Sequence, residues 1–304
     1  MDPIVALAGL LVGFVVGLTG MGGGALMTPV LVLLFKIEPL VAVSSDIVAA
    51  VIMKPVGGAV HWRHGTVHRS LVLWLMLGSI PSAFLGVILL RHFGSEKSIQ
   101  TVVKNALGVA LLVVACGLIV RPFLQRKRRA ELPVPLKVAR IRTLLIGVIG
   151  GLVVGITSVG SGSLIIIMLL MLYPRMRLSE LVGTDLVQAI PLVASAALAH
   201  LIFGEFHFAL TASILIGSIP GVFIGARFSA RAPDYVIRPA LIVVLTASAL
   251  KLLGVDTMLV GAVAALMTLL ALTFSVTTAY RAGRVAAAAA AAEASQPILL
   301  NGGP

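Results

Sequence analysis

The sequence has little charge and almost no cysteine. Asp, Glu, Lys and Arg make up 11% of its 304 residues, whereas 59% are hydrophobic and the mean hydropathy is +1.12. This composition excludes an ordinary soluble core and predicts an all-α polytopic membrane protein. The single cysteine, Cys116, leaves no disulfide framework within the chain. Because residues 1–3 lack the basic stretch of a signal peptide, we expect the first apolar run to stay in the mature chain.

Acidic residues are scarcer still, with 11 Asp and Glu against 23 Lys and Arg, which gives a net charge of +12. The basic residues gather between the apolar runs, most densely in the linker 122–142, which also contains Pro133 and Pro135. Lys and Arg concentrate in cytoplasmic loops of membrane proteins. We therefore interpret the linker as a cytoplasmic loop and the net charge as a topology signal, and we do not expect nucleic-acid binding.

Nine apolar segments predict the membrane-crossing elements. Two of them are about 33 residues long and would form unbroken helices of about 50 Å, against a hydrocarbon core of about 30 Å, so each must fold back as a broken hairpin. These two are residues 3–35 and 143–173. The remaining seven should be full spans, at 40–62, 69–92, 101–121, 179–202, 208–230, 235–254 and 257–280.

A glycine-rich stretch interrupts each hairpin, at 17–24 and again at 155–162. Glycine disfavours helix by about 1 kcal/mol per residue and leaves backbone groups that lipid cannot satisfy, so these loops should be buried or line a polar cavity. The half-helices 25–35 and 163–173 begin there, and their free N–H groups favour an anion. The candidate substrate-binding residues of the loops are Thr19, Gly20, Gly22, Gly23, Gly24, Thr157, Ser158, Gly160, Ser161, Gly162 and Ser163.

Other glycines lie at four-residue spacing, which is typical of helices that pack closely in membranes. These are Gly9, Gly13 and Gly17 in the first half and Gly151 and Gly155 in the second. We assign them to helix packing and keep the later clusters for function.

The chain contains an internal duplication. An offset of 138 residues places Gly17 on Gly155, and an offset of 139 places Asp46 on Asp185 and His61 on His200. The positive-inside rule favours inverted halves, since 17 of the 23 Lys and Arg are then cytoplasmic, whereas parallel halves leave 11 on each side. The predicted organisation is a first repeat (1–121), the linker (122–142), a second repeat (143–254), an additional transmembrane helix (255–284) and an Ala-rich tail (285–304), which we expect to be disordered.

Ionisable residues inside spans are costly and tend to face a cavity or a partner. Asp46 and Asp185 occupy matching positions, where they could carry protons or a coupling cation, cap the broken helices or pair with a buried cation. Lys54 has no counterpart, since Val193 stands at the matching position. Its alternatives are an ion pair with either aspartate, substrate binding and snorkelling to the surface. Gln188, one turn beyond Asp185, is a candidate wall residue of the cavity.

No metal or cofactor site is predicted. The histidines at 61, 64, 68, 200 and 207 have spacings that do not form a closed metal site, so we interpret them as interfacial. The glycine loops are not followed by Gly-Lys-Ser/Thr, and no nucleophile–base pair is evident, which disfavours an enzyme. An inverted repeat with two unwound segments is typical of secondary transporters. A variant of this function is a transporter whose Asp46 and Asp185 bind a cation cargo.

Several motifs recur in the same order in both halves and resemble the sulfite exporter TauE/SafE family over roughly residues 5–254. They are the paired glycine loops, the stretches 43–46 and 182–185, the histidines before Gly65 and Gly204, and two Gly-Ser-Ile-Pro sequences. The resemblance implies a multi-pass protein of the bacterial cytoplasmic membrane that exports sulfite, organosulfonates or related small anions. Its expected partners are the anion and the lipid bilayer, with a proton as a coupling ion.

Overall fold

The structure is a computed structural model that describes residues 2–19, 23–63, 65–92, 95–126, 138–203, 206–229 and 234–273, and these residues form helices and short connections. Over this part of the chain, five helices are long and apolar enough to cross a membrane by length and composition: Arg69–Leu90, Glu96–Arg121, Arg140–Thr157, Ser179–Phe203 and Phe208–Phe228. The all-α membrane fold expected from composition is therefore confirmed.

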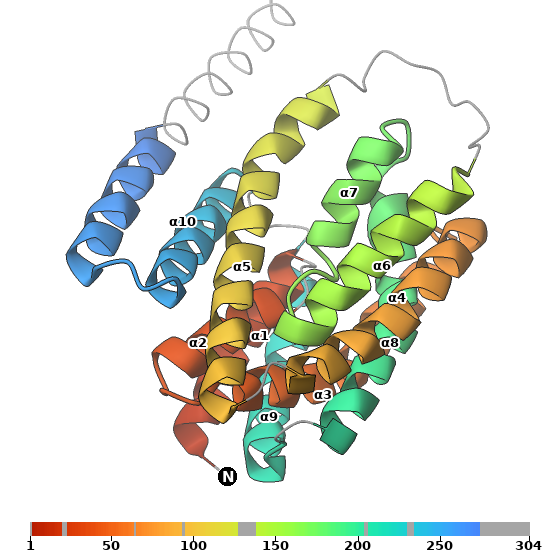
Figure 1. Ribbon diagram of the computed structural model, residues 1–304. Coiled ribbons are helices and arrows are strands. Elements are labelled where there is room, and N and C mark those ends of the chain that lie inside the picture. Colours follow the sequence, from red (N-terminus) through yellow and green to blue (C-terminus); the bar gives the residue numbers. More distant parts are fainter. Residues whose placement is uncertain are drawn as a thin grey trace, which may run out of the picture.

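The described helices follow the predicted order closely. Two helices that we expected to span, α3 and α10, lie outside the set of five, and α3 carries Asp46 and Lys54 in its middle. A shorter apolar helix follows at Thr257–Thr273. The elements shown in Figure 1 are α1 (Pro3–Thr19), α2 (Gly24–Leu33), α3 (Pro39–Arg63), α4 (Arg69–His92), α5 (Glu96–Arg126), α6 (Arg140–Thr157), α7 (Leu164–Leu172), α8 (Leu178–Phe203), α9 (Phe208–Ser229) and α10 (Asp234–Leu252).

Both long apolar runs are broken at their glycine clusters, as predicted, and the two arms of each hairpin are unequal. The first arms, α1 and α6, have 17 and 18 residues, whereas α2 and α7 have 10 and 9. At 1.5 Å per residue, α2 and α7 are about 15 Å long, half of a hydrocarbon core of about 30 Å. The glycine loops that precede them are therefore suited to a position near mid-depth.

Helical structure extends into both ends of the predicted linker, since α5 continues to Arg126 and α6 begins at Arg140. The rest of the linker, the end of the expected additional helix beyond residue 273 and the Ala-rich tail lie outside the described residues.

The glycines with four-residue spacing pack helix against helix, as the sequence indicated. A Cβ on Gly9, Gly13 or Gly17 would lie 2.9, 2.6 or 2.3 Å from the nearest carbonyl oxygen of α9, at Ile214, Ser218 and Val222 in turn. Gly151 and Gly155 approach Ser79 and Ala83 of α4 in the same way, at 2.4 and 2.3 Å. Residue numbers rise together on both sides of each contact, so α1 runs parallel to α9, and α6 runs parallel to α4.

Helices of the two halves pack against each other. The first helix of each half packs on the fourth helix of the other, α1 on α9 and α6 on α4, while the equivalent helices α3 and α8 pack together, as do α5 and α10. In Figure 1, α5 runs from the lower part of the molecule toward the top, whereas α10 runs downward, so these two equivalent helices are antiparallel. Leu40 near the start of α3 donates a backbone hydrogen bond to Gln100 near the start of α5. We call that end of the molecule the Glu38 end and the opposite end, where α6 begins, the Arg140 end.

Candidate functional site

The second glycine loop is held by unusual backbone angles. Ser158 ends α6 with φ of 60°, and Gly160 and Gly162 have φ of 135° and 93°, a region in which side chains with a Cβ are strained. The Thr157 hydroxyl donates to the Val153 carbonyl oxygen at 2.7 Å. Thr19, its counterpart in the first loop, donates likewise to the Val15 carbonyl oxygen at 2.8 Å. Both threonine hydroxyls, which we expected to serve as donors to an anion, are therefore bonded to their own helices.

The two loops meet. A Cβ on Gly24 would lie 2.0 Å from the carbonyl oxygen of Ser158, so the start of α2 contacts the second loop directly and glycine is required there. Gly23 stands beside Asp46, with 3.8 Å between an added Cβ and Oδ1. The other predicted residues of the first loop, Gly20 and Gly22, lie outside the described residues.

Asp46 is buried on α3 between the two hairpins. Its Oδ2 accepts hydrogen bonds from the Thr28 hydroxyl of α2 at 2.9 Å and from the Ser158 hydroxyl at 2.6 Å. This carboxylate therefore joins the half-helix of the first repeat to the loop of the second.

Asp185, at the matching position on α8, makes a different set of contacts. Its Oδ2 accepts from the backbone N–H of Gly162 at 2.5 Å, and its Oδ1 accepts from the Gln188 side chain at 2.9 Å. The Ser79 hydroxyl of α4 donates to the side-chain Oε1 of Gln188 at 3.1 Å. Gln188 is thus fully buried and orients Asp185. The Asp185 carboxylate is thus bonded to the Gly162 N–H just before α7, which is one of the donors that the sequence suggested for a bound anion.

Lys54 reaches the same place from α3. Lys54 is 8% exposed, and its ammonium donates to the Ser161 hydroxyl of the second loop at 2.5 Å. The charges of Asp185 and Asp46 both act on it. The Lys54 side chain therefore does not snorkel to the surface, which was one of the alternatives left open by the sequence. With all three groups ionised, the two carboxylates and one ammonium carry a net charge of −1. Ser163, the residue before α7, is also buried and follows Ser161 by two residues in the sequence.

One histidine is placed differently from our prediction. His200 is fully buried rather than interfacial. Its Nε2 lies 2.8 Å from the Gly155 carbonyl oxygen, and its Nδ1 lies 2.8 Å from the Ser44 hydroxyl. A carbonyl can only accept, so Nε2 carries a hydrogen, and Nδ1 pairs with the Ser44 hydroxyl, which is also placed to donate to the Leu40 carbonyl oxygen at 2.8 Å. This ring connects α3, α6 and α8, because the end of α8 packs against α3 inside the molecule.

The described residues contain no group of three or more His, Cys, Asp or Glu side chains arranged to hold a metal ion. The side chains of His61 and His64 lie outside this description. Two contributors were missed by sequence reasoning, Thr28 and Ser79. The sequence signal that could have identified them is a hydroxyl side chain within an apolar helix. Ser79 also lies in one of the two Gly-Ser-Ile-Pro sequences.

Comparisons with known proteins place the chain in a transporter family. Residues 5–252 match the family model described as Sulfite exporter TauE/SafE. A Bacillus subtilis (strain 168) protein named "Probable membrane transporter protein YjnA" is 43% identical over 256 residues, which cover 83% of this chain and 100% of that protein. "Probable membrane transporter protein YdhB" of the same organism is 22% identical over 238 residues, covering 78% and 94%. No solved structure matches significantly.

The matched segment spans both hairpins, the helices that carry Asp46, Lys54 and Asp185, and the packed glycine faces, and it ends where α10 ends. The helix at Thr257–Thr273 lies beyond it. The chain is a multi-pass membrane transporter protein and belongs to the TauE/SafE sulfite exporter family.

Proposed function

We propose that the chain is a secondary transporter that exports a small anion of the sulfite or organosulfonate class. The observation that carries this proposal is the position of Lys54, whose buried ammonium donates to Ser161 of the second glycine loop. A cation held in the apolar part of a transporter, beside an unwound segment, is suited to an anionic substrate.

The anion would take hydrogen bonds from Lys54, from the Ser161 and Ser158 hydroxyls and from backbone N–H groups of the glycine loops. The N–H of Gly162 is already bonded to Asp185. An anion that uses this donor must therefore displace the carboxylate. In this proposal the Asp185 carboxylate competes with the anion for the Gly162 N–H.

Charge balance links the anion to a proton. With Lys54, Asp46 and Asp185 all ionised, the net charge of −1 opposes an entering anion. A proton on Asp185 would remove that charge and weaken its hold on Gly162, because a neutral acceptor binds an N–H less strongly than a carboxylate does. Anion and proton would then bind together, which is the coupling role that we assign to Asp185 and, as its partner, Asp46.

The orientation of the halves follows from the same proposal. We place the Arg140 end in the cytoplasm of a bacterium, with the two repeats inverted across the cytoplasmic membrane. Support comes from the distribution of Lys and Arg and from the antiparallel course of the equivalent helices α5 and α10.

A second candidate is a transporter whose cargo is a cation bound by Asp46 and Asp185. The observation in its favour is that both buried carboxylates lie near one ammonium, which a cation could replace.

Counterflow in proteoliposomes distinguishes these functions. Vesicles without nucleotide are loaded with unlabelled sulfite, thiosulfate, sulfoacetate, sulfate or lactate, and uptake of labelled sulfite is followed. We expect exchange with sulfite and with at least one organosulfonate. Uptake that depends on added nucleotide, or exchange that follows a monovalent cation and none of the anions, would contradict the proposal.

A further inference from the structure

The two ends of the molecule differ at positions that the internal repeat matches. At the Arg140 end, the backbone N–H of His68 donates to the Thr184 hydroxyl at 3.1 Å, which fixes the start of α4 on α8. The Tyr173 hydroxyl accepts from the Ala139 N–H at 3.0 Å and is bonded to the Thr143 hydroxyl at 2.5 Å. These contacts join the start of α4 to α8 and the end of α7 to the start of α6 at the Arg140 end.

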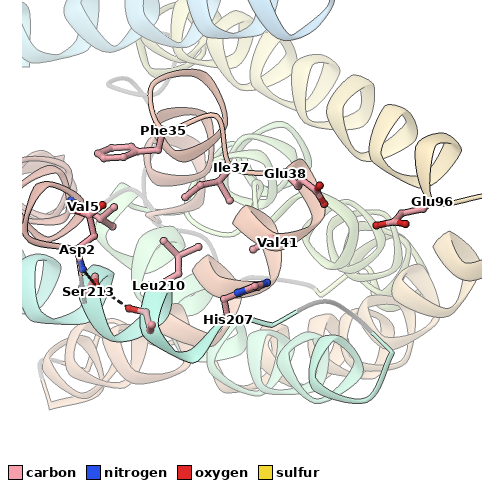
Figure 2. A pocket seen from close by; sticks show the side chains of 11 residues that line it. Asp2, Val5, Phe35, Ile37, Glu38, Val41, Glu96, His207, Leu210 and Ser213 are labelled. Carbon is pink, nitrogen blue, oxygen red and sulfur yellow. Dashed lines mark hydrogen bonds between the residues drawn. The ribbon is translucent and has the colours of Figure 1, made fainter.

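The matching positions at the Glu38 end surround a cavity. Offsets of 138 and 139 residues place Val5, Phe35 and His207 on Thr143, Tyr173 and His68. All three line a cavity of about 850 Å³, to which Val41 and Leu210 also contribute. Figure 2 shows these side chains around it, drawn from α1, the α2–α3 connection, α3 and α9. At these matched positions the Glu38 end has a cavity, whereas the Arg140 end has hydrogen bonds.

Burial follows the same asymmetry. Leu71 in the first turn of α4 is 0% exposed, whereas its counterpart Leu210 in the first turn of α9 is only half-buried and faces the cavity. His68 is half-buried, and its counterpart His207 is exposed. The start of α9 is thus less closely packed than the start of α4.

Ser45 is the counterpart of Thr184 and lies on α3, one turn deeper than Val41 on the same face. Its side chain is 0% exposed, yet among the described residues its hydroxyl has no hydrogen-bond partner. A buried polar group without a partner is unfavourable, so its presence calls for a state in which the bond is made. The start of α9 is already close, since the Thr211 hydroxyl donates to the Ser45 carbonyl oxygen at 3.5 Å.

We propose that Ser45 is the closing residue of a second gate, where it accepts a hydrogen bond from the His207 backbone N–H when α9 moves onto α3 and the cavity closes. The bond between His68 and Thr184 is its equivalent at the other end. The transport cycle alternates between the two bonds, and the structure is the state that is closed at the Arg140 end. This inference concerns the transport cycle and uses the family's transporter function, but it does not depend on the identity of the anion.

The test follows the accessibility of the cavity in lipid vesicles without substrate. Leu210→Cys is introduced in a Cys116→Ser background, and labelling by a hydrophilic maleimide is measured with either Thr184→Val or Ser45→Ala added. Loss of the Thr184 hydroxyl weakens the closed Arg140 end, so labelling at position 210 should fall, at most by the change of about 2- to 13-fold in the ratio of the two states that one neutral hydrogen bond gives. Ser45→Ala should keep labelling at the parent level or raise it.

A decrease with Ser45→Ala, or no decrease with Thr184→Val, would overturn the proposal. If either variant fails to fold, cysteine pairs replace it. A short thiol cross-linker should join His68→Cys with Thr184→Cys in resting protein, and it should also join Ser45→Cys with His207→Cys as the cavity closes. Absence of the second cross-link in protein that forms the first would refute the second gate. Because no substrate is needed, this failure is separate from a failure of the anion assignment.

Discussion

Asp185→Asn should increase the affinity for sulfite. In the structure the carboxylate accepts the Gly162 N–H and acts on the Lys54 ammonium, two groups that we assign to the anion. An asparagine oxygen can still accept the N–H but carries no charge. The variant has nearly the same shape, but its NH2 group stands in place of the oxygen that accepts from the Gln188 amide, so it weakens the hold of residue 185 on the site.

The magnitude follows from the two kinds of hydrogen bond. A bond to a charged group contributes about 1.5–3 kcal/mol and a neutral one about 0.5–1.5 kcal/mol, so the exchange lowers the barrier to displacement by about 1–1.5 kcal/mol. This corresponds to an affinity about 5- to 13-fold higher at 25 °C. Removal of the Asp185 charge, which acts on the Lys54 ammonium, has an effect in the same direction.

Equilibrium binding of labelled sulfite to purified protein measures this effect, and Asp46→Asn is the matched control. Asp46 accepts from two side-chain hydroxyls, those of Thr28 and Ser158, so its variant should gain less. Asp185→Asn should also exchange sulfite while losing proton-driven accumulation. Weaker sulfite binding in a folded Asp185→Asn protein would refute the competitor role.

Three further predictions concern packing, the buried histidine and topology. Gly13→Ala should lower the melting temperature, since its Cβ would lie 2.6 Å from a backbone oxygen. Gly23→Ala, whose Cβ would lie 3.8 Å from Asp46, should keep the melting temperature and weaken sulfite binding. The reverse pattern in thermal-shift assays with and without sulfite would contradict the assignment. His200→Ala should destabilise the protein by about 1–3 kcal/mol by leaving a buried carbonyl unsatisfied, measured by denaturant unfolding in detergent, and an unchanged midpoint would remove its bridging role. A cysteine at Arg175 should react from the cytoplasmic side alone, and labelling from outside would disprove the orientation.

The helices could be predicted from the sequence because their apolar lengths decide them. The segment 69–92 was predicted with the bounds that α4 has, and the glycine spacing identified the close contacts of α1 and α6. Ends at which polar residues continue a helix were predicted less well. The additional turns of α5 up to Arg126 lie in a basic stretch that hydropathy assigns to a loop.

The contacts of the site could not be derived in the same way. Asp46 and Asp185 were identified because a charge within an apolar span needs a partner, but their partners come from distant segments. Ser158 lies 112 residues from Asp46 in sequence, and Ser161 lies 107 residues from Lys54. Such pairs depend on how the halves pack. The same limit explains His200, whose place near the end of a span suggested an interface until the packing of α8 on α3 was known.

The glycine loops also have a reason that composition did not indicate. We expected glycine for the close approach of an anion, and the structure adds a conformational requirement, since Gly160 and Gly162 both have positive φ. Substitution at either position will therefore reduce stability as well as any binding, which makes Gly23 the better position for a test of the loops.

The central claim is that Lys54 and the glycine loops hold a small sulfur oxyanion, and equilibrium binding of labelled sulfite to wild-type and Lys54→Met protein tests it most directly. The methionine fills a similar volume without charge, and the hydrogen bonds that Asp46 and Asp185 accept do not come from Lys54, so the variant should remain folded. Loss of a charge-assisted contact of about 1.5–3 kcal/mol predicts affinity about 10- to 150-fold weaker than that of the wild type. Wild-type sulfite affinity in a folded Lys54→Met protein would contradict the claim and place the anion elsewhere.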